Sequence, residues 1–272
     1  MALQHKFTRL KRIISGYKSC LVAFSGGVDS AFLLKACSLV LPREDILAVT
    51  AVSATYPKDE LRKAKDLAKN IGVRLKVIKT AELDNEEFIE NSVSRCYFCK
   101  KELFSKLNAI ARRSKLKFVL DASNISDKSD YRPGNIAKQE LKIKSPLLEA
   151  GLSKEDICKL SKLLGLPSWN KPALACLASR IPYGIRITPG LLRRIDQAEA
   201  YLIGLGFRQV RLRHYNGLCR IEVEKNHLNR LLRNRQAIVE KLKDLGYNYI
   251  TLDLEGYRTG SLNEVINEKS IS

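Results

Sequence analysis

The sequence lacks any apolar run that could cross a membrane, which takes about 18 residues or more. Its amino terminus, MALQHKFTRLKRIISGYK, has neither the apolar core nor the small-residue cleavage site of a secretory signal. Histidine is scarce, and His5, His214 and His227 form no cluster; of these only His214 is expected to touch a substrate. We therefore predict a cytoplasmic protein, in which clustered cysteines more often indicate metal binding or catalysis than disulfides.

Acidic residues are also few. The chain has 48 Lys and Arg against 29 Asp and Glu, a formal net charge of +19. Such a field attracts polyanions, including nucleotides, phosphorylated metabolites and RNA. The basic residues are spread along the chain instead of forming a tail, so a solvated lysine-rich surface explains the charge equally well.

The first two thirds of the chain alternate between predicted strands and helices. Apolar runs and helical periodicity predict strands at 19–24, 45–54, 73–79 and 117–123, with helices that include 57–72 and 97–114. This order is typical of an α/β fold, a parallel sheet with right-handed crossovers and helices on both faces. Ligands of such sheets bind beyond the carboxyl ends of the strands.

Beyond about residue 186 the order of elements changes. The sequence predicts a helix, two strands, a second helix and a final strand, at 188–206, 208–215, 217–224, 227–246 and 248–254. We therefore predict two domains, residues 1–185 and a small α+β domain at 186–272 with its own sheet. Residues 262–272 are expected to form a weakly ordered tail.

The motif FSGGVDS joins the first predicted strand to the first helix of the sheet. Gly26 and Gly27 allow the backbone to approach a ligand and point N–H groups at it. The helix amino terminus adds partial positive charge, Ser25 and Ser30 add hydroxyls, and Asp29 is suited to Mg²⁺ or to orienting the loop. The GK[ST] ending of a Walker A loop is absent, so we predict a different kind of nucleotide phosphate loop.

A second group of polar residues follows the strand at 117–123. Its members lie at a carboxyl end, where they are suited to contact a nucleotide or Mg²⁺: Asp121, Ser123, Asn124 and Asp127. Further along, Asp130 and Arg132 have two possible roles, since they can pair with each other or bind a ligand.

The stretch SRCYFCKK contains the pair Cys96 and Cys99. A CxxC pair can be a redox pair, half of a zinc site, part of an iron–sulfur site or a purely structural feature. Cys99 begins a helical stripe with Leu103, Leu107 and Ile110, so its thiol is expected to face inward. Four other cysteines lie on predicted buried elements and are expected to be plain core residues: Cys20, Cys37, Cys158 and Cys219.

Arginines provide candidate anion ligands. Arg211 and Arg213 alternate along one predicted strand, so both guanidinium groups share a face and could clamp a phosphate. The alternative is that they are exposed arginines on an edge strand. Arg180 lies near Cys176 in sequence and could bind the substrate's phosphate or the pyrophosphate.

At SGGVDS the sequence resembles the PP-loop ATP pyrophosphatases, which hold ATP phosphates with this motif. The resemblance implies cleavage between the α- and β-phosphates, adenylation of a carboxylate or carbonyl oxygen, and displacement of AMP by a nucleophile. The family includes amidating enzymes and RNA thiolases, and the loop alone leaves the nucleophile open.

Nearly the whole chain also resembles the LarE family of sulfur transferases. The resemblance is carried by DASNISDKSDYRPG, SPLLEAGLSKEDI, PSWNKPALACLASRIPYG and RQVRLRHYNGLCRIEVE. It implies that ATP and Mg²⁺ activate the carboxylates of pyridinium-3,5-biscarboxylic acid mononucleotide, which become thiocarboxylates in nickel-pincer nucleotide biosynthesis. One departure is Asn170, where the family pattern has aspartate.

The resemblance assigns roles to Cys176 and the CxxC pair. In one LarE branch the matching cysteine gives up its own sulfur and is left as dehydroalanine. In another, which this chain resembles more, Cys96, Cys99 and Cys176 would bind a 4Fe-4S cluster that delivers sulfur from a sulfide or persulfide donor. The resemblance also implies phosphate binding by Arg180, Arg211 and Arg213, and a possible divalent cation at Glu199 and Glu222.

The sequence therefore predicts an ATP-dependent sulfur transferase with ATP, Mg²⁺ and a 4Fe-4S cluster as cofactors. By resemblance it forms homo-oligomers, often hexamers. The alternatives are a tRNA thiolase with the same cluster chemistry, single-turnover sulfur transfer from Cys176, and a non-catalytic nucleotide-binding iron–sulfur carrier. No appended RNA-binding module or zinc ribbon is recognisable, so a nucleic-acid partner is not expected.

Overall fold

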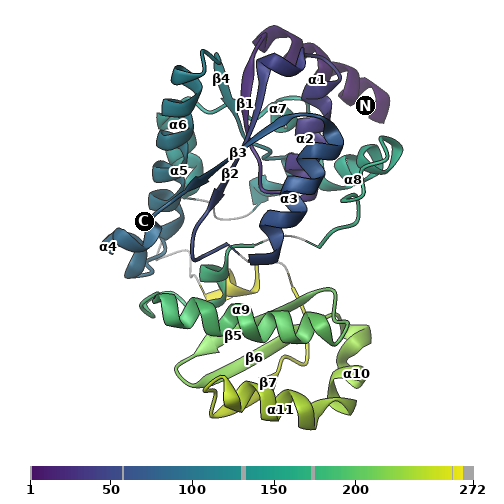
Figure 1. Ribbon diagram of the computed structural model, residues 1–272. Coiled ribbons are helices and arrows are strands. Elements are labelled where there is room, and N and C mark those ends of the chain that lie inside the picture. The colour runs from purple at the N-terminus through teal and green to yellow at the C-terminus, as the bar shows by residue number, and fades with distance from the viewer. Residues whose placement is uncertain (1, 57, 130–132, 173–174, 259, 266–272) are drawn as a thin grey trace. The chain divides into compact units, whose positions relative to one another are not determined.

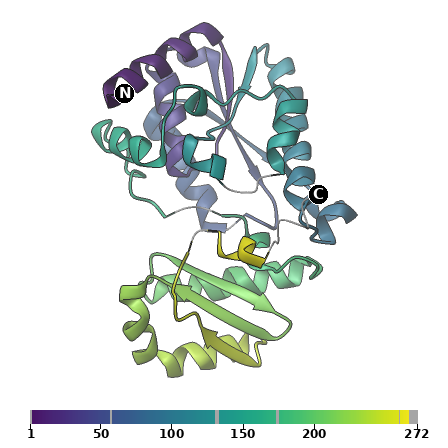
Figure 2. The ribbon, with the colours of Figure 1, turned by 180° about the vertical axis from the view of Figure 1, so that it is seen from behind.

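The computed structural model describes residues 2–56, 58–129, 133–172, 175–258 and 260–265, which fall into two compact units (Figures 1 and 2). The first unit comprises residues 1–53, 58–85 and 94–174, and the second comprises 54–57, 86–93 and 175–272. Two short segments of the second unit thus lie within the stretch of sequence that builds the first. Across these described ranges, no helix is long and apolar enough to span a membrane.

The first unit is built on a four-stranded sheet in the order β3-β2-β1-β4, with every pair parallel. Its strands are β1 (Cys20–Ala23), β2 (Ile46–Val52), β3 (Arg74–Lys79) and β4 (Phe118–Leu120). Leu21 of β1 lies opposite both Leu47 of β2 and Val119 of β4. The central strands are apolar on both faces because helices cover both faces, which confirms the predicted parallel α/β fold.

Helices cover the sheet of the first unit unequally (Figure 1). One face packs against α1 (Leu3–Tyr17), α2 (Val28–Ser38), α3 (Lys58–Ile71), α7 (Pro146–Glu149) and α8 (Lys154–Leu163). The other face packs against α5 (Arg95–Arg113), beside which lies α6 (Gly134–Glu140). α5 begins two residues before the predicted start, so both cysteines of the CxxC pair lie within its first five residues.

The second unit has a three-stranded sheet in the order β5-β6-β7. β5 (Val210–Tyr215) and β6 (Leu218–Val223) form an antiparallel hairpin, and β7 (Tyr249–Leu252) runs parallel to β6. Asn216 and Gly217 form the hairpin turn with positive φ angles of 42° and 95°, which suits a two-residue Asn-Gly turn. Together with α9 (Pro189–Gly204) and α11 (Arg235–Asp244), this sheet confirms the small α+β unit.

Shorter elements connect these parts. They are α4 (Glu86–Ile89), α10 (Leu228–Arg233), and the 3-10 helices η1 (Arg43–Asp45), η2 (Glu82–Asp84), η3 (Ile125–Ser129), η4 (Leu177–Arg180), η5 (Lys225–His227) and η6 (Ser261–Val265).

Two details of the second unit correct the sequence analysis. The helix predicted at 227–246 is divided at Asn234, whose side-chain amide donates to the Arg230 carbonyl at 2.8 Å and so ends α10 before α11 begins. Residues 262–265 of the predicted tail lie in η6, whose first residue, Ser261, is buried and hydrogen-bonded to Arg213 and Glu222.

Candidate active site

The predicted phosphate loop connects β1 to α2, and its shape requires glycine. Gly26 has a φ of +73°, and a Cβ atom there would lie 3.0 Å from Cβ of Ala64 on α3. Gly27 caps α2 with extended backbone, φ −78° and ψ 168°. Only glycine at position 26 therefore fits both the left-handed backbone and the close approach of α3.

Hydroxyl groups stabilise this loop from within. The Ser25 backbone N–H donates to Oγ of Ser30 at 3.3 Å, and that Oγ donates to the Gly27 carbonyl at 3.1 Å. The Gly27 N–H donates to Oγ of Ser25 at 3.3 Å. The Thr50 hydroxyl donates to the Phe24 carbonyl at 2.7 Å, which ties β2 to the start of the loop. The loop is thus preformed, with a helix amino terminus at its end.

Asp29 meets part of the second polar group predicted from the sequence. Its carboxylate accepts from Nδ2 of Asn124 at 3.3 Å and from Nζ of Lys154 at 2.6 Å. Asp127 lies beside them and accepts the Asn124 backbone N–H at 3.0 Å, which opens η3. The structure therefore brings Asp29, Asn124 and Asp127 to one edge of the sheet, together with a lysine that sequence reasoning missed.

Asp121 is more enclosed, at 9% exposure. Its carboxylate accepts hydrogen bonds from Ser123 at 2.6 Å, from Nζ of Lys138 at 3.0 Å, and from the Ser145 hydroxyl. These bonds join the end of β4 to α6 and to the start of α7, so Asp121 holds the edge of the sheet together. The predicted ligands Asp130 and Arg132 lie outside the described residues.

A third lysine lies directly beside the phosphate loop. Nζ of Lys171 donates to the Gly26 carbonyl at 3.1 Å and forms an ion pair with Glu60 of α3. Burial raises the pKa of Glu60, but the hydrogen bonds from Lys171 and Lys63 outweigh it, and the pKa falls below its usual value. Lys171 lies in the WNKPA segment next to Asn170. This segment has no helical or strand periodicity, so the sequence could not predict that Lys171 contacts the phosphate loop.

The CxxC pair lies in the first unit at the start of α5. Cys96 is exposed and Cys99 is half-buried. The predicted stripe of Leu103, Leu107 and Ile110 packs against the sheet, and Cys99 is at its end. Among the residues the structure describes, no group of three His, Cys, Asp or Glu side chains is close enough to hold a metal ion as it stands. Cys176, the third predicted cluster ligand, belongs to the second unit.

Cys176 precedes η4 and has an exposed side chain, while its backbone is firmly held. Arg180 is 2% exposed and donates from Nη1 to the carbonyls of Ala175 at 2.8 Å and Cys176 at 3.0 Å. Nε and Nη2 of Arg180 bind both carboxylate oxygens of Glu199, at 2.9 and 2.8 Å. Glu199 also accepts the Leu212 N–H of β5 at 2.9 Å. The Cys176 carbonyl is therefore linked to the sheet through a buried ion pair.

Arg213 forms a second buried pair of the same kind. It is 5% exposed and binds both oxygens of Glu222, which has no exposed surface, at 2.9 Å each. Its remaining nitrogen, Nη1, donates to the Ser179 carbonyl at 2.6 Å, and Nη2 also donates to Oγ of Ser261 at 2.8 Å. Four of the five N–H donors of this guanidinium are thus used within the protein.

Arg211 shares its face of β5 with Arg213, as predicted, and is 8% exposed. The alternative of two exposed edge arginines is therefore wrong. The Arg211 guanidinium lies 5.3 Å from the centre of the Tyr257 ring. Burial lowers the pKa of Arg211, and the neighbouring Arg180 lowers it further.

His214 points to the opposite face of β5 from Arg213, and its expected substrate contact stays a prediction. It alternates with Arg213 along β5, is 6% exposed, and its ring centre lies 5.8 Å from that of Tyr247. Burial lowers the pKa of His214, with Arg194 adding to the effect. The four cysteines predicted as core residues are buried or, for Cys158, half-buried.

The carboxylates proposed for a divalent cation are already occupied by arginine. Both oxygens of Glu199 bind Arg180, and both oxygens of Glu222 bind Arg213. All four carboxylate oxygens therefore face a guanidinium group. The predicted cation site stays a prediction.

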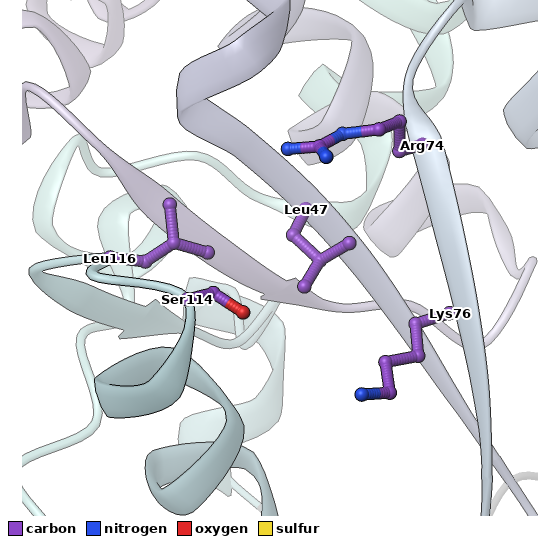
Figure 3. A pocket seen from close by; sticks show the side chains of 5 residues that line it. All are labelled: Leu47, Arg74, Lys76, Ser114 and Leu116. Carbon is purple, nitrogen blue, oxygen red and sulfur yellow. The ribbon is translucent and has the colours of Figure 1, made fainter.

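A pocket of about 350 Å³ lies elsewhere on the first unit (Figure 3). It is lined by Leu47, Arg74, Lys76, Ser114 and Leu116. Leu47 and Arg74 lie near the amino ends of β2 and β3, whereas the phosphate loop follows the carboxyl end of β1. None of the site residues predicted from the sequence lines this pocket.

Comparison with known proteins gives consistent matches over the chain. Residues 4–127 match the family model of NAD synthase. The chain is 39% identical over 268 residues to an uncharacterised protein of Synechocystis, covering 98% of this chain and 100% of that one. It is 36% identical over 251 residues to the pyridinium-3,5-bisthiocarboxylic acid mononucleotide synthase of Lactiplantibacillus plantarum, covering 92% and 91%. An uncharacterised protein of Methanocaldococcus jannaschii is 31% identical over 243 residues, covering 89% and 92%.

Proposed function

The chain belongs to the LarE family of ATP-dependent sulfurtransferases, and we propose that it converts carboxylates of pyridinium-3,5-biscarboxylic acid mononucleotide to thiocarboxylates. The proposal rests on the relative from Lactiplantibacillus plantarum, whose name states the bisthiocarboxylic product. The observation that carries it in this chain is Cys176, an exposed thiol on a backbone fixed by the buried Arg180–Glu199 pair.

The first step would occur at the phosphate loop of the first unit. A carboxylate oxygen of the substrate attacks the α-phosphorus of ATP, the bond to the β-phosphate oxygen breaks, and pyrophosphate leaves with Mg²⁺. The preformed loop binds the phosphates through backbone N–H groups and the start of α2. Lys154 contacts Asp29 and Lys171 contacts the Gly26 carbonyl at this edge of the sheet. Their ammonium groups could turn toward the negative charge of the ATP phosphates.

The second step needs a sulfur nucleophile. Sulfur attacks the carbonyl carbon of the acyl adenylate, the bond to the AMP oxygen breaks, and the thiocarboxylate forms. Arg180 serves as a positioning residue here, because it holds the backbone carbonyls of Ala175 and Cys176, which lie on either side of the Cys176 Cα atom. Arg211 and Arg213 would bind the substrate's phosphate, Arg213 through the one N–H donor that its bonds to Glu222, Ser179 and Ser261 leave over.

Cys96 and Cys99 suit an iron–sulfur group. The thiol of Cys99 lies 3.8 Å from the buried carboxylate of Glu82, whose Oε2 atom has no hydrogen-bond partner among the described residues. Thiolates are the ligands that iron–sulfur clusters require, and both cysteines lie at the start of α5. We propose Cys96, Cys99 and Cys176 as the ligands of a 4Fe-4S cluster, which supplies a renewable sulfide for transfer. This chain's part would be to hold the three thiolates, two of them at the start of α5.

The proposed function is tested by anaerobic turnover with ATP, Mg²⁺, a sulfide source and the pyridinium biscarboxylate nucleotide. We expect pyrophosphate release and a mono- or dithiocarboxylate detected by mass spectrometry. Cys176→Ala should still release pyrophosphate, since adenylation occurs at the phosphate loop, and should form no thiocarboxylate. Thiolation of tRNA instead of the pyridinium nucleotide would overturn the assignment.

The exposed thiol of Cys176 also favours a second candidate, single-turnover transfer of the cysteine's own sulfur. In that reaction the Cα–H proton and the sulfur both leave Cys176, and dehydroalanine remains. Intact-protein mass spectrometry after one turnover separates the two routes. An unchanged mass supports the renewable donor, and a loss equal to one H₂S supports sacrifice.

A further inference from the structure

Asn91 is a fully buried polar residue outside the helices and strands. Its exposed fraction is 0%, and its φ angle of 57° lies in the left-handed region that asparagine adopts more readily than most residues. It belongs to residues 86–93, one of two short segments of the second unit that interrupt the sequence of the first. A buried amide is costly unless its donors are satisfied, so its partners indicate its role.

The Asn91 side chain binds three backbone carbonyls that are close together in sequence. Its Nδ2 atom donates to the carbonyls of Pro182 at 2.7 Å, Ile185 at 2.9 Å and Ile181 at 3.4 Å. An amide nitrogen carries two hydrogens, so the longest of these bonds shares one with a shorter bond. One side chain therefore holds this whole turn by its carbonyls.

Backbone hydrogen bonds join the same two segments. The Gly184 N–H donates to the Asn91 carbonyl at 3.1 Å, and the Ile187 N–H donates to the Ile89 carbonyl at 2.9 Å. These bonds do not involve the amide, so a change of the Asn91 side chain leaves their donors and acceptors in place. The contribution of the amide can therefore be tested by itself.

The turn that Asn91 holds continues the segment that carries Cys176. Arg180 and Arg213 hold carbonyls at positions 175–179. Asn91 holds carbonyls of the turn that follows. Three buried side chains thus fix successive parts of the backbone from Cys176 onwards.

The chain also connects Asn91 to the CxxC pair. Cys96 follows Asn91 by five residues, and the chain returns to the first unit after residue 93. On the other side of the tie, Cys176 precedes Ile181 by five residues. An extended chain covers at most about 3.6 Å per residue, so each stretch can span no more than about 18 Å. The tie therefore limits how far these two cysteines can separate.

We propose that Asn91 is a positioning residue for the three-cysteine site, because it ties the Cys176 segment to the stretch that leads into the CxxC pair. The inference rests on the cluster ligands assigned under the proposed function, and it adds a residue that binds no iron itself. Without the amide, the third thiol would lie at a more variable distance from the other two. Metal ligands need such support from the residues around them, so the cluster should be held less tightly.

Two variants remove the donor in different ways. Asn91→Gly accepts the left-handed backbone without strain and has no side chain. Asn91→Asp keeps nearly the same shape, but its carboxylate cannot donate to the carbonyls. Asn216→Gly is the matched control, because Asn216 has a φ of 42° in the same unit and is exposed in the β5–β6 turn. Circular dichroism and ATP-dependent pyrophosphate release check folding, and Asn91→Asp carries the test if Asn91→Gly does not fold.

The first measurement follows the cluster itself. The full-length protein is reconstituted anaerobically with iron and sulfide and then titrated with an iron chelator. Both Asn91 variants should lose their iron–sulfur absorption at about tenfold lower chelator concentration than the wild type, the lower end of what loss of an outer-sphere partner costs. Asn216→Gly should match the wild type. Equal cluster retention in a folded Asn91 variant would overturn the proposal.

The second measurement needs no cluster. In metal-free protein with Cys99→Ser, Cys96 and Cys176 are the two exposed cysteines. Glutathione disulfide oxidises them to one disulfide, takes up their two electrons and two protons, and becomes two molecules of reduced glutathione. The equilibrium gives the effective concentration of one thiol at the other, which should fall about tenfold in the Asn91 variants and stay unchanged in Asn216→Gly. A wild-type background that forms no such disulfide would contradict the tie.

Failure of this inference is distinguishable from failure of the proposed function. Thiocarboxylate formation by the wild type, with a disulfide equilibrium that ignores both Asn91 variants, would remove Asn91 from the site and leave the activity standing. Conversely, an equilibrium that depends on Asn91 in a protein that thiolates no pyridinium nucleotide would keep the tie and overturn the assigned reaction.

Discussion

The two units hold their charged site residues in opposite ways. In the second unit, the side chains of Arg180 and Glu199 are 3% and 9% exposed and meet through two parallel hydrogen bonds. In the first unit, Lys154 and Asp29 are 39% and 28% exposed and share a single contact. Guanidinium groups match carboxylates with a rigid fork, whereas an ammonium group is a mobile point charge.

This difference suggests different roles for the arginines of the second unit and the lysines of the first. The guanidinium groups of Arg180 and Arg213 bind backbone carbonyls at positions 175, 176 and 179 as well as a carboxylate, so they hold the backbone around Cys176. We expect Lys154 and Lys171 at the phosphate loop to turn from Asp29 and Glu60 toward a bound phosphate. The substitutions below separate these roles by comparing the free energy of unfolding with activity. All variants are measured in the same buffer and at the same temperature as the wild type.

Breaking an arginine pair should have the largest effect on stability. Arg180→Met leaves the Glu199 carboxylate buried with only the Leu212 N–H as partner, and we expect a loss of about 3–5 kcal/mol in the free energy of unfolding. Urea denaturation followed by circular dichroism measures it. Thiolation should fall together with stability, because the Cys176 carbonyl loses its donor.

Arg186→Met provides the matched control within the same unit. Arg186 and Glu86 form an ion pair, but their side chains are 58% and 60% exposed. Removing an exposed pair should leave the unfolding curve unchanged. A similar loss in both variants would mean that chain packing, and not the buried charge, accounts for the effect of Arg180→Met.

Much of the architecture was predictable because it depends on local patterns. Apolar runs such as LVAF and periodic stretches such as ELRKAKDLAKNI gave the parallel strands and their helices. The division of the helix near Asn234 was missed, since one asparagine only weakly disfavours helix and its cap depends on a contact seen in the folded chain.

The candidate site was predictable only in part, for a physical reason. Motif residues such as Asp29 and Cys176 stand out in the sequence, but their partners come from distant segments: Lys154 pairs with Asp29 across 125 positions. Nothing local distinguishes Lys154, Lys171 or Glu82 from other charged residues on a basic surface. For the same reason the burial of Arg213 could not be foreseen, as it requires Glu222 on the neighbouring strand.

Gly26→Ala should have the next largest effect on stability, and it tests whether the phosphate loop of the first unit requires glycine. Its backbone is left-handed, and the added Cβ would lie 3.0 Å from Cβ of Ala64, so we expect a loss of about 2 kcal/mol. ATP-dependent pyrophosphate release should be lost as the loop shifts.

Gly27→Ala is the matched control. Its φ is in the ordinary range, and the atom nearest to an added Cβ is Oγ of Ser25 at 3.4 Å, so we expect a loss below about 1 kcal/mol in the free energy of unfolding. Equal costs would contradict the requirement for glycine at 26.

Lys171→Met should separate activity from stability. We expect about 1 kcal/mol of destabilisation, because Lys63 still pairs with Glu60, while the KM for ATP in pyrophosphate release rises at least about tenfold. Lys63→Met removes the other partner of the same carboxylate without touching Gly26. Its cost should be about 0.3 kcal/mol, with the KM unchanged. A raised KM in both variants would assign the effect to Glu60 instead of to the loop contact.

The smallest expected effect concerns the pH dependence of stability at His214 in the second unit. Burial lowers the pKa of His214, and Nδ1 has no hydrogen-bond partner among the described residues, so the folded state favours the neutral ring. Below about pH 6.5 the unfolded chain binds a proton that the folded chain excludes, and stability must therefore rise with pH through this window. His214→Phe should flatten the rise in urea midpoints between about pH 5.5 and 7.5. An unchanged slope would mean that His214 binds its proton equally well in the folded and unfolded chains, despite burial and the positive charge of Arg194.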